Sequence, residues 1–304
     1  MQKTLINICG SERSGSTMLD LIIGNEPRAF SCGEIYALYR PWRKHHFQPG
    51  CGCGRQDCEY LEEFRRVSED QFHSLLFEKF GYDWIVDSSK DLTWVVDNQQ
   101  WITQKSGRVL NLVIWKKPTT FSISFLKRGK DANYWRKIFM DYYKKFLEAE
   151  LPFVSVCYDD FVNEPRKYLG LISDLLGMEN FDGKMNFWEK KHHQLFGSGG
   201  TGKQVLEGAS EIFRQVEYPP QFEKDIKLIE ASLDNDAEVT AIIDELRQRE
   251  ISLLNVSQKD PFNYDRPGKK PPWYYKQKIA LKIRRYFPES YQQRGKRRKT
   301  RNHQ

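Results

Sequence analysis

The fold is decided by residues 4–23, TLINICGSERSGSTMLDLII, in which an apolar run, a glycine-bounded loop and a second apolar run follow one another without a break. The first run, residues 4–9, is apolar on both faces, as expected of a buried parallel strand. The loop, GSERSGST, comes close to the phosphate-binding pattern GxxxxGK[ST], and a helical pattern follows it. This stretch therefore predicts a strand, an anion-binding loop and a helix N-terminus in the order that phosphate binding requires.

Further apolar runs alternate with helical patterns along the chain. More buried strands are predicted at residues 84–87, 109–115 and 152–158, and helices at 17–23, 69–80, 92–104, 119–128, 135–149, 165–176 and 236–254. Ser68 and Gln71 are predicted to form a capping box at the start of the second helix. The alternation predicts an α/β fold, a doubly wound parallel β-sheet flanked by helices, with ligands bound beyond the carboxyl ends of the strands.

The composition changes towards the C-terminus, which predicts one domain over residues 1–258 and a basic, Pro/aromatic-rich extension over residues 259–304. The extension is expected to begin as an extended segment, DPFNYDRPGKKPPWYYK, to contain a short basic helix, KIALKIRRYF, and to end in disorder. Residues 266–304 hold 14 of the 48 Lys and Arg residues and one acid, so the rest of the chain is net negative although the whole chain carries +7. The net charge therefore disfavours a generally basic nucleic-acid-binding body, and the extension is the part predicted to contact an anionic surface or another subunit.

The N-terminal residues, MQKTLINICG, lack the pattern of a secretory signal, and no apolar run in the sequence reaches membrane-spanning length. The six cysteines are therefore expected to be reduced thiols in a cytoplasmic protein.

The first loop departs from the phosphate-binding pattern at one position, where Ser16 replaces the lysine. That lysine serves the β- and γ-phosphates of a nucleoside triphosphate, so its absence disfavours an ordinary ATPase or kinase. Arg13 brings a cation into the loop instead, and Ser14, Ser16 and Thr17 offer hydroxyl donors. The loop suits a tetrahedral anion on a 5′-phosphate with no bridging metal.

Residues 13–27, RSGSTMLDLIIGNEP, resemble the 5′-phosphosulfate loop of sulfotransferases that use 3′-phosphoadenosine 5′-phosphosulfate (PAPS). The resemblance implies a P-loop NTPase-like sulfotransferase fold. It also implies in-line transfer of a sulfonate group to a hydroxyl or amine of a small-molecule acceptor, with adenosine 3′,5′-bisphosphate as the product and no metal. It assigns the 5′-phosphate and the sulfonate to Arg13, Ser14, Gly15, Ser16 and Thr17.

A second motif of the family is a strand that leads into a helix, with Arg at the strand end and Ser eight residues later, both on the 3′-phosphate. Here Lys116 stands in the place of the Arg, and Ser124 follows at the family's spacing. Taken without the resemblance, this pair is typical of a solvated helix start. Weaker similarities extend over roughly residues 4–180 and include SCGEIY, CGCGRQDCEY, VDSSK and VCYDDFVNEP.

Candidate catalytic residues lie near the expected ligand side of the sheet. Glu34, in the Gly-Glu element, is the first candidate for the base, although relatives with two consecutive acids use the second, where this chain has Ile35. His46, with its neighbour His45, is a rival base in a basic stretch that also fits a plain surface role. Lys90, just after the strand WIVD, is predicted either to contact the cofactor or leaving group, or to stay solvated beside a helix capped by Ser88.

Cys51, Cys53 and Cys58 form the pattern C-x-C-x4-C. Three thiols at this spacing suit zinc with Cys32 or His46 as the fourth ligand, but the pattern is not a common zinc motif. We interpret it as a structural loop with free or paired cysteines, and we predict no metal and no catalytic thiol.

A second glycine loop, residues 197–203, GSGGTGK, fits GxxxxGK but lacks the following Ser/Thr and a convincing strand before it. Lys203 is predicted to reach the nucleotide from this loop, although a plain surface loop is an equal interpretation. With Asp87 as a Walker-B-like acid, the loop supports the alternative of an ATP-dependent small-molecule kinase. A second alternative is a non-enzymatic anion-binding module that uses the basic extension.

Overall fold

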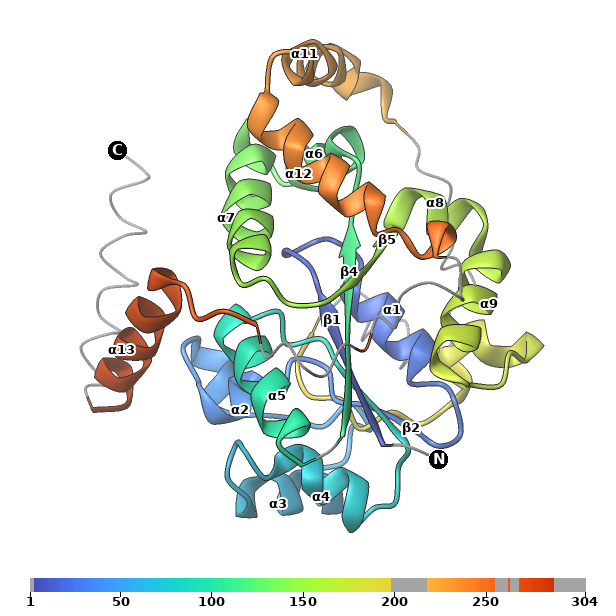
Figure 1. The fold of residues 1–304 in the computed structure, drawn as a ribbon, viewed down its shortest axis with the longest axis vertical. Helices are drawn as coiled ribbons and strands as arrows, with labels where there is room; N and C mark the ends of the chain where they lie inside the picture. Colours follow the sequence, from blue (N-terminus) through green and yellow to red (C-terminus); the bar gives the residue numbers. More distant parts are fainter. Residues whose placement is uncertain (1–2, 106, 198–217, 255–261, 263–267, 287–304) are drawn as a thin grey trace.

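A five-stranded parallel sheet, in the order β2-β3-β1-β4-β5, forms the centre of the protein (Figure 1). The computed structural model describes residues 3–105, 107–197, 218–254, 262 and 268–286. The strands are β1 (Thr4–Cys9), β2 (Ala29–Ser31), β3 (Trp84–Asp87), β4 (Arg108–Trp115) and β5 (Val154–Cys157). The predicted α/β parallel sheet is confirmed, and β2 is a strand that the sequence patterns did not predict because three residues show no periodicity.

Helices lie on both faces of the sheet. Among the described residues the α-helices are α1 (Ser16–Ile23), α2 (Tyr36–Tyr39), α3 (Glu59–Arg66), α4 (Phe72–Glu78), α5 (Leu92–Thr103), α6 (Pro118–Leu126), α7 (Tyr134–Glu148), α8 (Tyr158–Asn163), α9 (Pro165–Leu176), α11 (Glu223–Leu233), α12 (Ala237–Gln248) and α13 (Pro272–Tyr286). Short 3₁₀ turns are η1 (Lys44–Phe47), η2 (Asp182–Met185), η3 (Phe187–Glu189), η4 (Pro220–Phe222) and η5 (Ile251–Leu253). No helix in the described ranges has both the length and the apolar character needed to cross a membrane.

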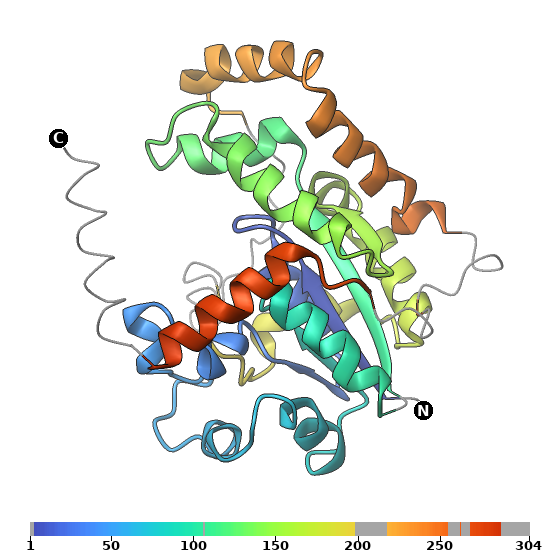
Figure 2. The ribbon, with the colours of Figure 1, turned by 60° about the vertical axis from the view of Figure 1, so that its left-hand side comes forward.

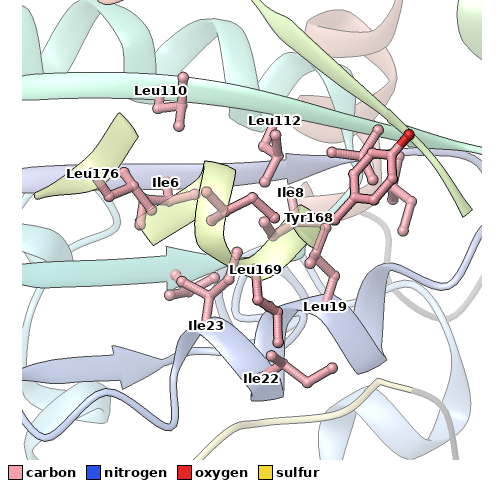
Figure 3. Close-up of a cluster of buried hydrophobic side chains, with 14 of the residues drawn as sticks. Ile6, Ile8, Leu19, Ile22, Ile23, Leu110, Leu112, Tyr168, Leu169 and Leu176 are labelled. Carbon is pink, nitrogen blue, oxygen red and sulfur yellow. The ribbon is translucent and has the colours of Figure 1, made fainter. Parts of the chain in front are cut away.

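The strands are apolar on both faces because each face packs against helices. Ile6 and Ile8 of β1 point towards α1 and α9, together with Leu110 and Leu112 of β4 (Figure 3). Alternate residues such as Val113 point to the opposite face, where α5, α7 and α12 pack. Each fully buried Leu or Ile contributes about 1.5–3 kcal/mol relative to exposure, so this double burial fixes the position of β1 at the centre of the sheet.

Two predicted helices end or begin elsewhere. The capping box predicted at residues 68–71 is wrong: α4 begins at Phe72, and the Ser68 hydroxyl donates to Asp70 instead. The helix predicted at residues 236–254 ends at Gln248, since the next carbonyl, of Arg249, accepts a hydrogen bond from the backbone N–H of Ser155 on the edge strand β5. Tertiary contacts replace local hydrogen bonds at both points.

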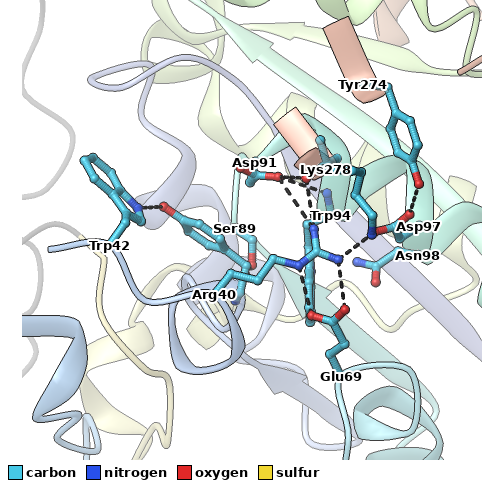
Figure 4. Close-up of polar contacts among 12 residues, drawn as sticks. Arg40, Trp42, Glu69, Ser89, Asp91, Trp94, Asp97, Asn98, Tyr274 and Lys278 are labelled. Carbon is cyan, nitrogen blue, oxygen red and sulfur yellow. Dashed lines mark hydrogen bonds and ion pairs between the residues drawn. The ribbon is translucent and has the colours of Figure 1, made fainter. Parts of the chain in front are cut away.

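The C-terminal extension departs from expectation where it meets the body. Residues 272–276 are helical rather than extended, because α13 begins at Pro272 and packs along α5 (Figure 2). Tyr274 is buried and donates to Asp97 at 2.6 Å, and Lys278 Nζ lies 2.8 Å from the same carboxylate (Figure 4). The buried Arg40 guanidinium also binds Asp97, at 2.6 Å. This network fastens α13 to the body, while the partner of the extension stays a prediction.

Candidate functional site

The loop between β1 and α1 has the geometry of an anion-binding turn. Arg13 (φ 71°) and Gly15 (φ 101°) both adopt left-handed backbone conformations, which turn the chain tightly into α1. A Cβ atom at position 15 would lie 2.4 Å from the ring of Tyr158, so only glycine fits there. No side chain caps the N-terminus of α1, which leaves the positive end of the helix facing the cavity described next.

A cavity of about 550 Å³ opens above this loop, at the carboxyl ends of the strands. After each strand from β1 to β5, the chain reaches a residue that lines this cavity, either at once or within a few residues. The lining residues include Gly10, Glu12, Arg13, Gly15, Ser16, Thr17, Glu34, Tyr36, Trp42, His46, Lys90, Lys116, Tyr142, Tyr158 and Gly197. Most of the residues predicted from the motifs therefore converge on one cavity.

Lys116 follows β4 at one side of the cavity, with its ammonium nitrogen 3.9 Å from the centroid of the Tyr158 ring. The pKa of Lys116 is lowered to about 8, chiefly by burial, with a smaller contribution from the nearby cations, which are Arg13, Lys127 and Arg128, and against the opposing effect of Asp159. Neither Lys116 nor Arg13 forms an ion pair with another described residue. This gathering of cations without a paired anion is the electrostatic signature of a site for a small polyanion.

Glu34 and Lys90 meet on the other side of the central loop. Lys90 Nζ lies 2.6 Å from Glu34 Oε1, and both side chains are largely buried. The backbone N–H of Glu34 donates to the carbonyl of Leu195 at 2.8 Å, which anchors the loop that follows β2. Lys90 has a left-handed backbone (φ 61°), so its side chain is directed to Glu34 at the cost of local strain.

His46 lines the cavity but is poorly suited to act as a base. Its pKa is lowered to about 4, chiefly by burial and to a smaller extent by the neighbouring His45 and Arg43. Its Nδ1 atom accepts the backbone N–H of Trp42 at 3.3 Å, which leaves the proton of the neutral ring on Nε2. His46 is therefore neutral at pH 7, with the lone pair of Nδ1 already engaged.

Three predicted ligands lie away from the cavity lining or outside the described residues. Ser14 is fully buried beneath the loop, and its hydroxyl finds no hydrogen-bond partner in the described parts of the chain. Ser124 sits on α6, where its hydroxyl donates to Thr120 at 3.4 Å. Lys203 lies outside the described residues, as does most of the second glycine loop.

The residues next to Lys90 show which side chain caps α5. The N-cap of α5 is Asp91, whose carboxylate accepts the N–H of Trp94 at 3.0 Å, so the prediction that Ser88 caps this helix is wrong. The Ser88 hydroxyl donates instead to Asp20 at 2.6 Å. The pKa of Asp20 is raised to about 7, chiefly by burial and to a smaller extent by Asp87, against the opposing effect of the hydrogen bond from Ser88.

Asp87 does not have the surroundings of a Walker-B acid. Its Oδ2 atom accepts from Trp94 Nε1 at 2.7 Å and lies 3.2 Å from His73 Nε2, and its Oδ1 atom accepts the N–H of Ser89 at 2.9 Å. Asp87 is buried and is not among the residues that line the cavity. The carboxylate is thus committed to the core, which removes the Walker-B-like acid from the support for the kinase alternative.

Sequence patterns missed several aromatic residues of the site. The Tyr142 hydroxyl accepts the N–H of Gly10 at 2.8 Å, although α7 lies far from the loop in sequence. Trp42 Nε1 donates to the Tyr36 hydroxyl at 2.7 Å, and both side chains line the cavity. Only Tyr158 carried a usable signal, because it is the last residue of a predicted strand.

No protein-family model matches the chain, and no curated protein matches it. Among solved structures, it is similar to the sulfotransferase domain from the curacin biosynthetic pathway, with 16% identity over 77% of this chain and 97% of that one and a TM-score of 0.47. It is also similar to the sulfotransferase domain from the Synechococcus PCC 7002 olefin synthase, with 17% identity over 76% and 94% of the two chains and a TM-score of 0.45. These likenesses concern the path of the chain, and the function has to be inferred from the residues of the site.

Proposed function

We propose that the protein is a sulfotransferase that moves the sulfonate group of PAPS to a hydroxyl or amine of a small-molecule acceptor. The observation that carries the proposal is the cluster of cations around Lys116, beside a phosphate-type loop that lacks the lysine of nucleoside triphosphatases. Such a site favours a nucleotide with separate phosphate groups and requires no bridging metal. Cytoplasmic location stays a prediction.

The order of the strands suggests how the donor lies. The loop after β1 is central, Lys116 and Tyr158 follow β4 and β5 on one side, and Glu34 and Lys90 follow β2 and β3 on the other. We place the 5′-phosphosulfate on the loop, held by Arg13, the N–H groups at the start of α1 and the hydroxyls of Ser16 and Thr17. The 3′-phosphate then lies on the β4 and β5 side, and the acceptor on the β2 and β3 side.

Lys116 is the main ligand proposed for the 3′-phosphate. Lys127 and Arg128 act electrostatically on Lys116, which supports a role for the end of α6 at this phosphate. Ser124 belongs to the same helix and is retained as a secondary ligand, reached by a change of side-chain rotamer from its bond to Thr120. Lys203 is retained as a ligand from the second glycine loop.

Glu34 is proposed as the general base and Lys90 as the residue that positions it. In the reaction the acceptor oxygen or nitrogen forms a bond to sulfur while the bond from sulfur to the 5′-phosphate oxygen breaks. The acceptor proton passes to Glu34, and the electron pair of the broken bond leaves on the phosphate, where Arg13 and the helix N-terminus neutralise it. His46 is a donor through Nε2 rather than a base, which follows from its engaged Nδ1 atom.

The walls on the acceptor side suggest what the acceptor looks like. Tyr36, Trp42 and His46 line the cavity there and offer aromatic surface, beside the charged side chains of the same wall, which are Glu34, Arg43, Lys90 and Asp91. An acceptor with a flat apolar body and one hydroxyl or amine fits such a wall better than a polyanionic glycan does.

Calorimetric titration of the full chain with adenosine 3′,5′-bisphosphate tests the donor half of the proposal. We expect binding without added metal, and binding at least tenfold weaker for adenosine 5′-monophosphate, which lacks the 3′-phosphate. Tighter binding of Mg-ATP than of the bisphosphate would contradict the proposal. A panel of phenols, alcohols and amines with labelled PAPS then tests for transfer.

Arg13→Asn is the variant for the transfer step, because asparagine tolerates a left-handed backbone better than alanine does. We expect at least a hundredfold loss of kcat/KM with the labelled donor and an unchanged melting temperature. Lys227→Ala, which removes an exposed cation of α11, is the matched control and should retain full activity.

A further inference from the structure

Four potential metal ligands meet at the edge of the molecule beside α3. They are Cys51, Cys53, Cys58 and His193, and their donor atoms all lie within 4.8 Å of one another. Cys58 precedes α3 and is 3% exposed, and His193 comes from a segment 135 residues further along the chain. The cluster therefore joins two parts of the chain that no local interaction brings together.

The two distances from His193 to Cys51 and Cys58 match those of a tetrahedral zinc site. His193 Nδ1 lies 3.5 Å from Cys51 Sγ and 3.3 Å from Cys58 Sγ. With zinc–sulfur and zinc–nitrogen bonds of ordinary length, the edge between a sulfur and a nitrogen ligand of a tetrahedron is about 3.5 Å. Both ligand pairs are thus spaced to share one ion.

The backbone around the thiols has the form of a metal-binding turn. Gly54 has φ 76°, and its N–H donates to the carbonyl of Cys51 at 3.0 Å, which brings Cys51 and Cys53 to the same side of the turn. Cys58 is the N-cap residue of α3, so the start of this helix fixes the position of its sulfur beside the turn. The turn and the helix thereby place three sulfur atoms in a preformed arrangement.

The alternative fourth ligands considered from the sequence are wrong. Neither Cys32 nor His46 belongs to the group of donors, and the fourth potential ligand is His193. No pattern in the sequence singled out His193, because its distance along the chain from the thiols is set only by folding.

We propose that Cys51, Cys53, Cys58 and His193 bind one zinc ion as a closed structural site. Three thiolates and one imidazole select zinc over harder cations, and four protein ligands leave no open position for a reacting group. The prediction of no metal is replaced by this proposal. The proposal does not depend on the proposed sulfotransferase activity, since it concerns residues outside the cavity lining.

The site would act as a clamp on the cavity wall. Leu195, two residues after His193, accepts the N–H of Glu34 at 2.8 Å, and its own N–H donates to Cys32 at 2.9 Å. Gly197 follows, lines the cavity and approaches Thr17 of the phosphate loop so closely that an added Cβ would lie 3.3 Å from the Thr17 methyl group. Zinc would hold this segment against the turn at residues 51–54, where Gly52 N–H already donates to Gln194 at 2.9 Å.

Metal analysis of the full chain tests the proposal. After purification under reducing conditions without chelator, we expect about one zinc per chain. A mercurial thiol reagent should release one zinc ion for every three thiols that it modifies at the site. Cobalt(II) exchanged into the site should show the visible bands of a tetrahedral thiolate complex. Chelator treatment should lower the melting temperature, and added zinc should restore it.

Variants identify the ligands. Cys53→Ser and His193→Asn should each lose most of the zinc and change the cobalt spectrum, whereas the controls Cys32→Ala and His46→Ala should keep both. The cobalt spectrum of the unmodified chain keeps the test decisive if a ligand variant fails to fold. A zinc-free chain that takes up neither zinc nor cobalt(II) after reduction would overturn the proposal. A disulfide between two of the three thiols that persists under reducing conditions would overturn it too.

Discussion

Nucleotide binding should weaken as the pH rises through the pKa of Lys116. Burial and neighbouring cations hold this pKa at about 8 in the free protein. A bound phosphate dianion supplies the missing opposite charge, so it should raise the pKa of Lys116 in the complex. Binding above pH 8 therefore requires uptake of a proton, and it becomes less favourable with increasing pH.

The magnitude follows from the fraction of Lys116 that is protonated. With a free pKa of about 8, that fraction is about 90% at pH 7 and about 10% at pH 9. The Kd for adenosine 3′,5′-bisphosphate should therefore rise about tenfold between these pH values, which corresponds to about 1.4 kcal/mol. At pH 8.5, about three quarters of a proton should be taken up per nucleotide bound.

Calorimetry in buffers of different ionisation enthalpy measures both quantities. Lys116→Arg is the matched control, because guanidinium stays charged over this range and should bind with little change between pH 7 and pH 9. Lys116→Met keeps the length of the side chain without its charge, and should bind weakly at both pH values. If the unmodified chain and Lys116→Met share one pH profile, the proposed role of Lys116 is refuted.

Three further variants test other parts of the site and the fold. Gly15→Ala should abolish nucleotide binding and lower the melting temperature, because the added Cβ would lie 2.4 Å from the Tyr158 ring. The double variant Gly15→Ala with Tyr158→Ala should recover part of the stability. A melting temperature of Gly15→Ala equal to that of the unmodified chain would contradict the loop geometry. Glu34→Gln should lower kcat at least a hundredfold in the labelled-donor assay while the Kd for the bisphosphate stays within threefold, and an unchanged kcat would rule out Glu34 as the base. Tyr274→Phe should cost about 1 kcal/mol in denaturant unfolding through loss of the buried hydrogen bond to Asp97, and no measurable cost would mean that this hydrogen bond does not stabilise the attachment of α13.

Local sequence was enough to predict the framework of the site. The run from Thr4 to Ile23 predicted β1, the loop and α1, and the structure has these elements at those positions. Lys116 was predicted from its place in the motif of the resembled family, and Lys90 from its position just beyond a buried strand. Both line the cavity, because in a parallel sheet the carboxyl ends of the strands meet at one edge. The strands and helices themselves could be predicted because they depend on periodicity and on neighbouring residues.

Other features depend on contacts between distant residues, and sequence patterns did not reveal them. Tyr142 reaches Gly10 across 132 positions, and its helix offered only an apolar stripe as a signal. The structure also changed the meaning of residues that were correctly singled out. His46 lines the cavity, but its surroundings lower its pKa and engage Nδ1, which removes it as a base.

The sequence by itself determined that the chain forms a parallel α/β sheet with a glycine-bounded loop after the first strand, because strand burial, glycine spacing and helix starts are local properties. Only the tertiary structure decided which charges meet. The strand order separates Lys116 from the Glu34–Lys90 pair, and folding brings His193 to three thiols that lie more than 130 positions away. The physical reason is that electrostatic and ligand contacts depend on distance in space, which packing of the whole chain sets.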